Sequence, residues 1–417
     1  MFFISLFNNE KVFASHKKNN LQLTLTSNQM HYSLNLDYTT TSNIHTIIWQ
    51  ASKFSRMSKN ENKAKRILNF FEATNNIENS FEMVFPGIKT EIDKIEKQIN
   101  TKSVNAKLKL NGAFQVIKEK NGLVLDREKL YFDILEKLKT ENDNLSVEIP
   151  TKIIEAKFKE EDLKKSTNLR SSFTTDYSKS SPERKNNIQK AISSFNGMNI
   201  YPGETISFNK TTGSRTAKNG YQEAKIILGG EYIQGFGGGV CQASTTIYNA
   251  CLTSGLECKA RCHSIPPSYI SKGLDAMVNS GSSDMTITNN LSFPIYIEAY
   301  CTNEKIVCNI YGENLNGYSY KTKVEINEIL PDKGYKKIID TKNEYADKVL
   351  YTDESFVKQK ATQGFKTTTY LQTFKDNKFI KQEKIRSDYY PASEGIIIYG
   401  NKERPPQEIT FFDEFII

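Results

Sequence analysis

A run of glycines that leads directly into a cysteine constrains the fold of this chain more than any other feature. In GFGGGVCQASTTIYNA, residues 235–250, four of the first five positions are glycine and Cys241 follows soon after. Glycine adopts backbone conformations that other residues avoid, and it lets another chain segment approach closely. The next positions place Ile247 and Cys251 on one helical face. The sequence therefore predicts a tight turn that enters a helix over residues 242–254.

The predicted helix has a recognisable end and a chemically special start. Gly255 and Leu256 are placed to close it with a Schellman-type cap. Cys241 falls at or just before the first turn, where unpaired N–H groups and the positive end of the helix dipole stabilise a thiolate. The backbone N–H groups of Cys241 and Gln242 could also hold an oxyanion formed on an attacked carbonyl. Cys241 is therefore the candidate nucleophile.

Only one histidine shares this part of the chain with Cys241. Three of the four histidines precede residue 46, and the fourth, His263, lies in the loop RCHSIPPSYI. Two prolines mark an irregular loop, where functional residues concentrate. Asp275 could orient the imidazole, and Ser264 could hold it from the other side. A lone histidine is more often structural, and Cys/His pairs form in space rather than in sequence, so the pair is a prediction for the structure to test.

The cysteines favour packing over a metal site. All six lie between residues 241 and 308. Cys258 and Cys262 are the nearest two and His263 follows them, but a zinc site needs a further ligand pair. We expect no metal and no other cofactor. Cys251 is expected to be a packed thiol on the helix face.

Two hairpins are predicted in the second half of the chain. Cys301 and Cys308 should face each other across a turn at residues 304–305, either as a disulfide or as buried thiols, with buried thiols favoured. Residues 364–385 alternate on either side of a turn at KDNK. These strands give the second half of the chain an antiparallel character.

Several classes of ligand fit the sequence poorly. The glycine run lacks the GKS or GKT of a phosphate-binding loop and the acidic residue of a Rossmann unit, so no nucleotide is expected. The net charge of +8 suits an anionic wall polymer or a membrane surface. No aromatic–basic motif points to nucleic acid, and no apolar run approaches the roughly 20 residues of a membrane span.

The pattern along the chain predicts a multidomain α+β protein. A helix is expected over residues 187–196, with an apolar stripe of Ile188, Ile192 and Phe195. Residues 164–185 show no periodicity and are predicted to be a polar connection. The predicted domains are an N-terminal α+β region, a small α+β domain, a mixed domain of helices and antiparallel strands, and a β-rich module, at residues 1–85, 86–162, 165–312 and 325–402.

The first 15 residues leave two interpretations open. MFFISLFNNEKVFAS combines a short apolar run with a small-residue site. It is compatible with the remnant of a secretory signal whose front is missing, and equally with an ordinary N-terminal strand.

Several long motifs together resemble the VanW domain family. YPGETISFNKTTGSRTAKNGYQEAKIILGG, GFGGGVCQASTTIYNACLTSGLE, HSIPPSYISKGLDAMV and DMTITNNLSFPIYI follow one another with family-like spacing across about residues 168–312. Residues 86–162 resemble the peptidoglycan-binding-like domain often found before a VanW domain. Residues 325–402 are similar to the wall-associated module named for its five glycines, although much of its glycine pattern is absent.

The resemblance implies an extracellular bacterial enzyme of the cell wall or the outer face of the cytoplasmic membrane, of the kind found in Gram-positive bacteria. Some proteins with this domain order act as L,D-transpeptidases that make 3-3 cross-links through the cysteine of the GGGVCQ motif. That residue is Cys241 here, and the implied partners are peptidoglycan stem peptides and, from the charge, anionic wall polymers. The implied catalytic residues are Cys241, His263, Asp275 and Ser264. The implied substrate-binding residues are Gly238, Gly239, Gln242, Arg261 and Tyr269.

One position departs from the family pattern. The family commonly has a second histidine two residues before the HS motif, whereas this chain has Arg261. Arg261 could hold a stem-peptide carboxylate, and a surface salt bridge is the competing interpretation. A non-catalytic wall-binding or scaffold protein, in which the glycine–cysteine segment only builds a groove, is the alternative to the enzyme.

Overall fold

The computed structural model describes residues 18–27, 30–39, 78, 81–82, 85–138, 144–228 and 231–405. The candidate signal segment at residues 1–15 lies outside the described residues. The chain divides into two compact units, the first within residues 1–106 and 118–159 and the second within 107–117 and 160–417. None of the helices in the described ranges has the length and hydropathy needed to cross a membrane.

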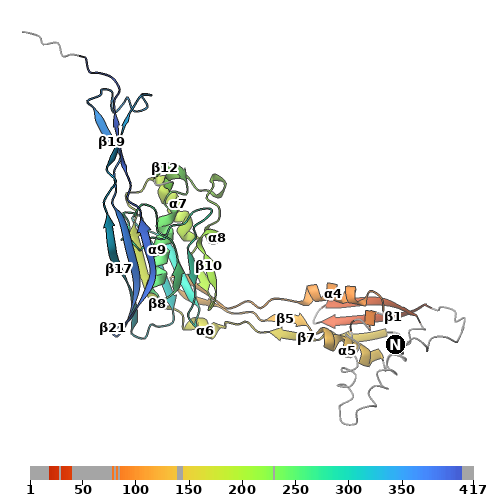
Figure 1. Ribbon diagram of the computed structural model, residues 1–417. Helices are drawn as coiled ribbons and strands as arrows, with labels where there is room; N and C mark the ends of the chain where they lie inside the picture. The colour runs from red at the N-terminus through yellow and green to blue at the C-terminus, as the bar shows by residue number, and fades with distance from the viewer. Residues whose placement is uncertain are drawn as a thin grey trace, which may run out of the picture. The chain divides into compact units, whose positions relative to one another are not determined.

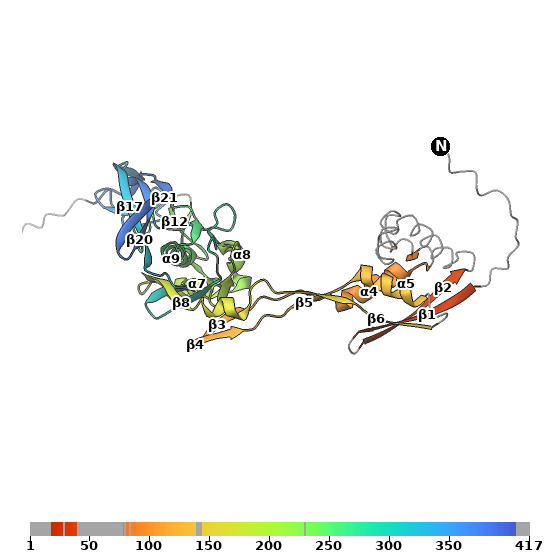
Figure 2. The ribbon, with the colours of Figure 1, turned by 90° about the horizontal axis from the view of Figure 1, so that it is seen from below.

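The first unit pairs a small sheet with two helices, which are labelled in Figure 2. Strand β1 pairs with β2 in antiparallel fashion and with β6 in parallel fashion. The apolar side chains of Ile92, Ile95 and Ile99 are buried on α4. Leu21, Leu23 and Leu25 from β1 share one core with α4 and α5, so the structure places no boundary at residue 85. The elements of this unit are β1 (Lys18–Ser27), β2 (Met30–Thr39), α4 (Ile88–Ile99), β5 (Gly122–Leu125), α5 (Arg127–Leu138), β6 (Asn144–Glu148) and β7 (Thr151–Ile154).

The second unit is built around helix α9 (Val240–Thr253), shown in green in Figure 1. Its N-terminal part also contains β3 (Lys107–Asn111), β4 (Ala113–Ile117), α6 (Glu160–Lys164), β8 (Asn168–Asp176), α7 (Pro182–Ser193), β9 (Met198–Ile200), β10 (Thr205–Ser207), α8 (Phe208–Thr212), a 3-10 turn at Ala217–Asn219, β11 (Glu223–Leu228) and β12 (Glu231–Phe236). After α9 come β13 (Glu257–Lys259), β14 (Thr286–Thr288), β15 (Ile295–Cys301), β16 (Lys305–Gly312), β17 (Tyr318–Leu330), β18 (Tyr335–Ile339), β19 (Ser355–Gln359), β20 (Gly364–Lys375), β21 (Lys378–Tyr390) and β22 (Gly395–Tyr399).

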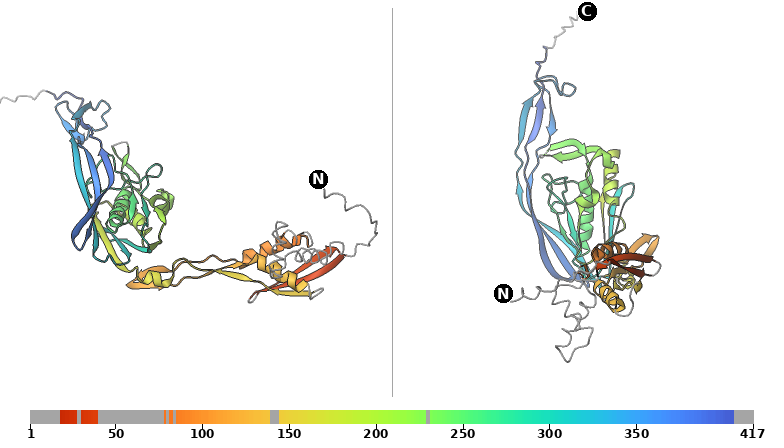
Figure 3. Two further views of the ribbon diagram at one scale, coloured as in Figure 1. Left: turned by 60° about the horizontal axis from the view of Figure 1, so that its bottom comes forward. Right: turned by 90° about the vertical axis from the view of Figure 1, so that its right-hand side faces the viewer.

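Helix α9 contacts sheets on more than one side. The strand order β8-β16-β15-β9 forms one sheet, β10-β14-β13 a second and β17-β20-β21 a third. The helix contacts β8 and β16 of the first sheet, β13 of the second and β17 of the third, an arrangement visible in both views of Figure 3. The multidomain α+β class with a β-rich C-terminal part is therefore confirmed.

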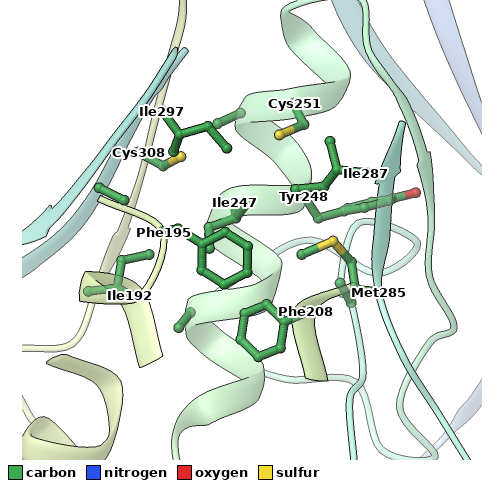
Figure 4. Packing of buried hydrophobic residues seen from close by; sticks show 14 of the residues in the cluster. Ile192, Phe195, Phe208, Ile247, Tyr248, Cys251, Met285, Ile287, Ile297 and Cys308 are labelled. Atoms are coloured by element: carbon green, nitrogen blue, oxygen red, sulfur yellow. The ribbon is translucent and has the colours of Figure 1, made fainter. Parts of the chain in front are cut away.

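The core of the second unit surrounds α9 (Figure 4). Phe195 stacks on Phe208 with ring centroids 5.2 Å apart, and the predicted stripe of Ile188, Ile192 and Phe195 is buried. Cys251 is fully buried in this core, as expected of a packed thiol. At the helix end Gly255 N donates to Leu252 O and Leu256 N to Cys251 O, both at 3.1 Å, which confirms the Schellman cap.

The structure corrects the interpretation of residues 164–185 as a polar connection. Most of that segment is strand β8 and the first turn of α7. On the inward face of β8 the hydroxyl groups of Ser171 and Thr175 lie on either side of Phe173, which packs against the core. Ser171 Oγ lies 2.6 Å from Thr253 Oγ1, and Thr175 Oγ1 lies 2.8 Å from Thr246 Oγ1. Because buried hydroxyl groups take two of these inward positions, the hydrophobic alternation is weak, and for that reason the sequence pattern missed the strand.

Two further predictions differ from the structure, one in the bounds of a helix and one in the pairing of two strands. The helix predicted over residues 187–196 begins earlier, because Ser181 caps it by accepting a hydrogen bond from Arg184 N and Pro182 occupies its first turn. In the β15–β16 hairpin Cys301 pairs with Ile306 and Cys308 with Ala299, so the two cysteines are diagonal neighbours and do not face each other. Both are free thiols.

Candidate functional site

The candidate nucleophile lies at the start of α9, directly after the glycine turn. Gly239 caps the helix with φ of 105°, a conformation that favours glycine. Cys241 is the second residue of the helix and is half-buried. Its thiol donates to the Val278 carbonyl oxygen at 3.2 Å. The position predicted from sequence, within the first helical turn, is the one observed.

His263 and Asp275 form a buried pair beside this cysteine. His263 Nδ1 lies 2.6 Å from Asp275 Oδ2, and the backbone N–H of His263 donates to the same oxygen at 2.7 Å. The exposed fraction is 6% for His263 and 0% for Asp275. Because Nδ1 is committed to the carboxylate, Nε2 is the ring nitrogen left for the Cys241 thiol, and the imidazole and the thiol are close enough to shift each other's pKa.

The three side chains shift one another's pKa values toward charged forms. Burial alone would raise the pKa of Cys241, but the hydrogen bond and charge of His263 outweigh burial and lower it. Burial alone would lower the pKa of His263, but the hydrogen bonds with Asp275 and Cys241 raise it to about 9. Burial likewise works against ionised Asp275, and hydrogen bonds from His263 and Tyr390 lower the pKa of that carboxyl. The site therefore favours the thiolate and imidazolium forms more than isolated cysteine and histidine side chains would.

A polar stripe on α9 fixes the segment that carries Asp275. Ser244 Oγ donates to Ala276 O at 2.6 Å, and Thr245 Oγ1 accepts from Ala276 N at 2.9 Å. One turn further on, Asn249 Nδ2 donates to Leu274 O at 2.8 Å. These buried side chains replace the hydrogen bonds that Leu274–Ala276 would otherwise make in a strand or helix, so α9 positions the carboxylate as well as the thiol.

The C-terminal sheet holds the same segment from strand β21 and strand β20. Tyr390 Oη donates to Asp275 Oδ1 at 2.5 Å and accepts from Gly273 N at 2.6 Å. Arg386 Nη2 donates to Asp275 O at 2.6 Å and to Gly273 O at 2.9 Å, and Thr369 Oγ1 donates to Gly273 O at 2.8 Å. These three residues were not predicted from the sequence, because contacts separated by about a hundred positions leave no local signal.

Two arginines near Cys241 were also missed. Arg215 Nη1 donates to Val278 O at 3.2 Å, the oxygen that accepts from the Cys241 thiol. Arg184 Nη2 donates to Gln242 Oε1 at 2.8 Å. Burial lowers the pKa of both guanidinium groups, while charge interaction with Cys241 acts in the opposite direction. The sequence Ser-Pro-Glu directly precedes Arg184 and is typical of a helix start, so it could have predicted that Arg184 lies in the first turn of α7.

The three predicted loop residues differ in their burial and in their contacts. Tyr269 is half-buried, and burial together with the charge of Cys241 raises its pKa, which places its hydroxyl near the thiol. Ser264 is exposed and, among the described residues, has no hydrogen bond to His263, whose Nδ1 is already taken by Asp275. Arg261 is exposed and pairs through its backbone with Met277.

The residues flanking Cys241 are held by close packing and by hydrogen bonds within the protein. A Cβ on Gly238 would lie 2.7 Å from the Lys225 carbonyl oxygen, and one on Gly239 would lie 2.8 Å from Arg184 Cγ, so both glycines serve close packing. Gln242 is 1% exposed, and its side chain donates to Asp176 O at 2.7 Å. Its backbone N–H donates to Gly239 O at 2.9 Å. Gln242 therefore offers neither a substrate contact nor an oxyanion donor, which leaves the Cys241 N–H.

The remaining cysteines near the site point to different neighbours. Cys258 lies on β13 next to Cys251, and Cys262 Sγ faces Tyr389 O at 3.7 Å. Burial raises the pKa of Cys262 to about 11. Cys262 is therefore a half-buried thiol of ordinary or low reactivity beside the candidate pair.

Comparison with known families assigns this site to a described domain type. The family model for VanW like protein matches residues 183–311, which include the thiol, the imidazole and the carboxylate. This part of the chain is similar to the VanW domain. A peptidoglycan-binding domain model matches residues 33–146, starting well before the predicted residue 86, and the G5 domain model matches residues 333–402. These matches associate the protein with the cell envelope and with peptidoglycan.

Two curated relatives are similar to about a third of the chain. The uncharacterized protein YoaR of Bacillus subtilis is 33% identical over 151 residues, covering 36% of this chain and 50% of the relative. The vancomycin B-type resistance protein VanW of Enterococcus faecalis is 26% identical over 141 residues, covering 32% of this chain and 51% of the relative. The chain thus spans about half the length of the curated relatives it matches.

Two solved G5 domains each align with about a fifth of the chain. The IgA1 protease G5 domain aligns with 21% of this chain and 92% of its own, at 14% identity and a TM-score of 0.14. The HP0197 G5 domain aligns with 20% of this chain and 97% of its own, at 19% identity and a TM-score of 0.12. With TM-scores this low, the G5 assignment rests on the family model.

Proposed function

We propose that the protein is a cysteine acyltransferase that forms 3-3 cross-links in peptidoglycan by L,D-transpeptidation. One observation carries the proposal: Asp275 holds the His263 imidazole by a hydrogen bond, and that imidazole and the Cys241 thiol at the start of α9 shift each other's pKa, in a region similar to the VanW domain. This is the nucleophile–base–orienting group arrangement of covalent catalysis. The matches to peptidoglycan-binding and G5 domains support a wall substrate.

In the first half-reaction the Cys241 thiolate attacks the carbonyl of the third stem residue, a diamino acid, of a donor tetrapeptide. The developing oxyanion accepts a hydrogen bond from the Cys241 N–H at the helix start. The His263 imidazolium gives its proton to the leaving amine of the terminal D-Ala. A thioester forms, free D-Ala departs and His263 is left neutral.

In the second half-reaction the side-chain amine of a neighbouring stem attacks the thioester. Neutral His263 takes the amine proton, Cys241 leaves as thiolate, and the thiolate–imidazolium pair is restored. Asp275 keeps Nδ1 protonated throughout, so that Nε2 always faces the reacting atoms. If water replaces the amine, the same site acts as a carboxypeptidase.

The place of action and further partners follow from this chemistry. Stem peptides lie outside the cytoplasmic membrane, so the protein would work in the wall or at the outer face of that membrane. The net charge of +8 would favour contact with anionic wall polymers. No nucleotide, nucleic acid, metal or cofactor is part of the proposed reaction.

Muropeptide analysis tests the proposal. The purified protein is incubated with disaccharide-tetrapeptide, and intact mass is followed for an acyl adduct that hydroxylamine removes. The parent should form the adduct and 3-3 dimers, Cys241→Ala should form neither, and Cys262→Ala should match the parent. Binding of muropeptides without an adduct on Cys241 would favour the non-catalytic scaffold.

A further inference from the structure

The strongest unassigned feature lies beside the thiol, where two guanidinium groups have no acidic partner. Arg184 and Arg215 are both half-buried, and within the described residues neither forms a salt bridge. Their hydrogen-bond partners are neutral: Ser180, Gln242, Asn209 and the Val278 carbonyl oxygen. Half-buried guanidinium groups without a hydrogen-bonded acidic partner are costly, so this pair is suited to an anionic ligand.

Geometry places both arginines against the glycine turn that leads to Cys241. The side chain of Arg215 lies 3.0–3.3 Å from the position of a Cβ on Gly237, and Arg184 Cγ lies 2.8 Å from that of a Cβ on Gly239. Arg215 also shares the Val278 carbonyl oxygen with the Cys241 thiol. The two arginine side chains therefore contact the turn that leads to Cys241, one at each end, and the charge of Cys241 acts on both guanidinium groups.

The nearby acids are committed elsewhere. Asp284, whose charge Arg215 senses, accepts hydrogen bonds from Ser207 Oγ and Asn209 N. Asp275 is held by His263 and Tyr390. The positive charge beside the thiol is thus left for a ligand.

We propose that Arg184 and Arg215 form a carboxylate subsite beside Cys241. The occupant is the free α-carboxylate of a peptide acid whose scissile carbonyl lies one residue before its C-terminus. A residue spans only about 3.5 Å, so a carboxylate that close to the reacting carbonyl falls within reach of groups bordering the sulfur. Guanidinium forks match carboxylates in geometry and charge.

This subsite deepens the proposed acyl transfer and rests on it for its biological substrate. It would select donors with a single residue beyond the scissile bond, and the leaving amino acid would depart with its carboxylate. It also replaces Arg261, the sequence-based candidate, whose side chain is exposed.

Two alkylating reagents test the subsite without any wall substrate. Iodoacetate carries a carboxylate, whereas iodoacetamide is neutral. Because both reagents react with the thiolate, the ratio of their rates at Cys241 does not depend on the fraction of Cys241 that is thiolate. We expect Arg184→Gln and Arg215→Gln each to lower the acetate-to-acetamide ratio about tenfold. Arg404→Gln, which removes a guanidinium already paired with Asp353 and Glu354, should leave the ratio at the parental value.

A second measurement uses the parent chain alone, in case the glutamine variants fold poorly. N-acetyl-D-alanine should slow iodoacetamide alkylation of Cys241, and N-acetyl-D-alaninamide should not. Equal protection by acid and amide overturns the subsite, as does an unchanged reagent ratio in both glutamine variants. A fall in the acetate-to-acetamide ratio in Arg261→Gln alone would show that Arg261 binds the carboxylate instead.

The outcomes separate this inference from the function on which it rests. A carboxylate preference at Cys241 with no muropeptide adduct supports the subsite and contradicts transpeptidation. An adduct that forms equally fast from tetrapeptide and from its C-terminal amide supports acyl transfer and overturns the subsite.

Discussion

Removing one hydroxyl from strand β21 should disturb the candidate site without touching its three principal side chains. In Tyr390→Phe, Asp275 Oδ1 loses a donor at 2.5 Å and Gly273 N loses its acceptor at 2.6 Å. Both groups are buried, so water does not replace either bond. A hydrogen bond to a charged group contributes about 1.5–3 kcal/mol and an orphaned buried N–H costs at least about 1 kcal/mol. We expect the free energy of unfolding to fall by roughly 2–4 kcal/mol.

The pH dependence of this loss identifies its cause. The folded-state pKa of Asp275 lies below the ordinary value of 3.8, with Tyr390 among the groups that lower it. A depressed carboxyl pKa stabilises the fold above that ordinary value, and the stabilisation is lost as the pH falls through the folded-state pKa. The difference between parent and variant should therefore be largest near neutral pH and shrink below about pH 3.8. Urea unfolding at several pH values measures it.

A neighbouring tyrosine supplies the control. Tyr389 is 56% exposed, so Tyr389→Phe should unfold at the parental urea midpoint. Alkylation of Cys241 by iodoacetamide gives the readout at the site, because a loosened Asp275 no longer holds the imidazole against the thiol. The reasoning is refuted if Tyr390→Phe matches Tyr389→Phe in both urea midpoint and alkylation rate.

Three further changes test other parts of the site. Because His263 lowers the pKa of Cys241, His263→Ala should slow iodoacetamide alkylation of Cys241 at pH 6.5 by at least about tenfold. The folded-state pKa of His263 is about 9 rather than 6.5. The stabilisation that His263 gives the parent, measured by urea unfolding, should therefore be complete below pH 6.5 and lost as the pH rises through about 9. Gly239→Ala combines positive φ with a contact at 2.8 Å, and it should lower the free energy of unfolding by roughly 3 kcal/mol. Gly281→Ala, with open space around it, should change the free energy of unfolding by less than about 0.5 kcal/mol. Equal urea midpoints for the two variants would contradict the packing argument. A chain ending at Gly312 should lose the rapid alkylation of Cys241, and parental reactivity in that chain would show that the C-terminal sheet is dispensable.

Local sequence signals were sufficient where short-range physics decides the structure. Gly255 and Leu256 predicted the helix cap because a Schellman motif needs only a few consecutive residues. The i, i+3, i+4 spacing of apolar residues predicted the stripe on α7 and the burial of Cys251. The site pair was predictable to the same extent, since Cys241 and His263 are the reactive side chains of one glycine-rich region.

The missed features depend on pairings between distant segments. Tyr390 and Asp275 are 115 positions apart, and no periodicity connects them. Strand β8 buries the hydroxyl groups of Ser171 and Thr175, which hydrogen-bond with α9, so its apolar alternation is weak. Gln242 seemed available for substrate because it follows the cysteine, yet its side chain turns inward to Asp176 O. In each case a buried polar contact replaced the apolar contact that sequence patterns detect.

The contacts of Gly273–Asp275 argue that the VanW-like domain and the C-terminal sheet form one functional unit. Family models divide the chain into a match ending at residue 311 and another beginning at residue 333. Yet Asp275 receives its donors from both, from His263 in the first match and Tyr390 in the second. A Cβ on Gly273 would lie 2.7 Å from Thr369 Oγ1, so the segment is closed against β20 with no room for another side chain. Because a general base is only as well placed as the carboxylate that orients it, the wall-associated module would act in the chemistry as well as in attachment.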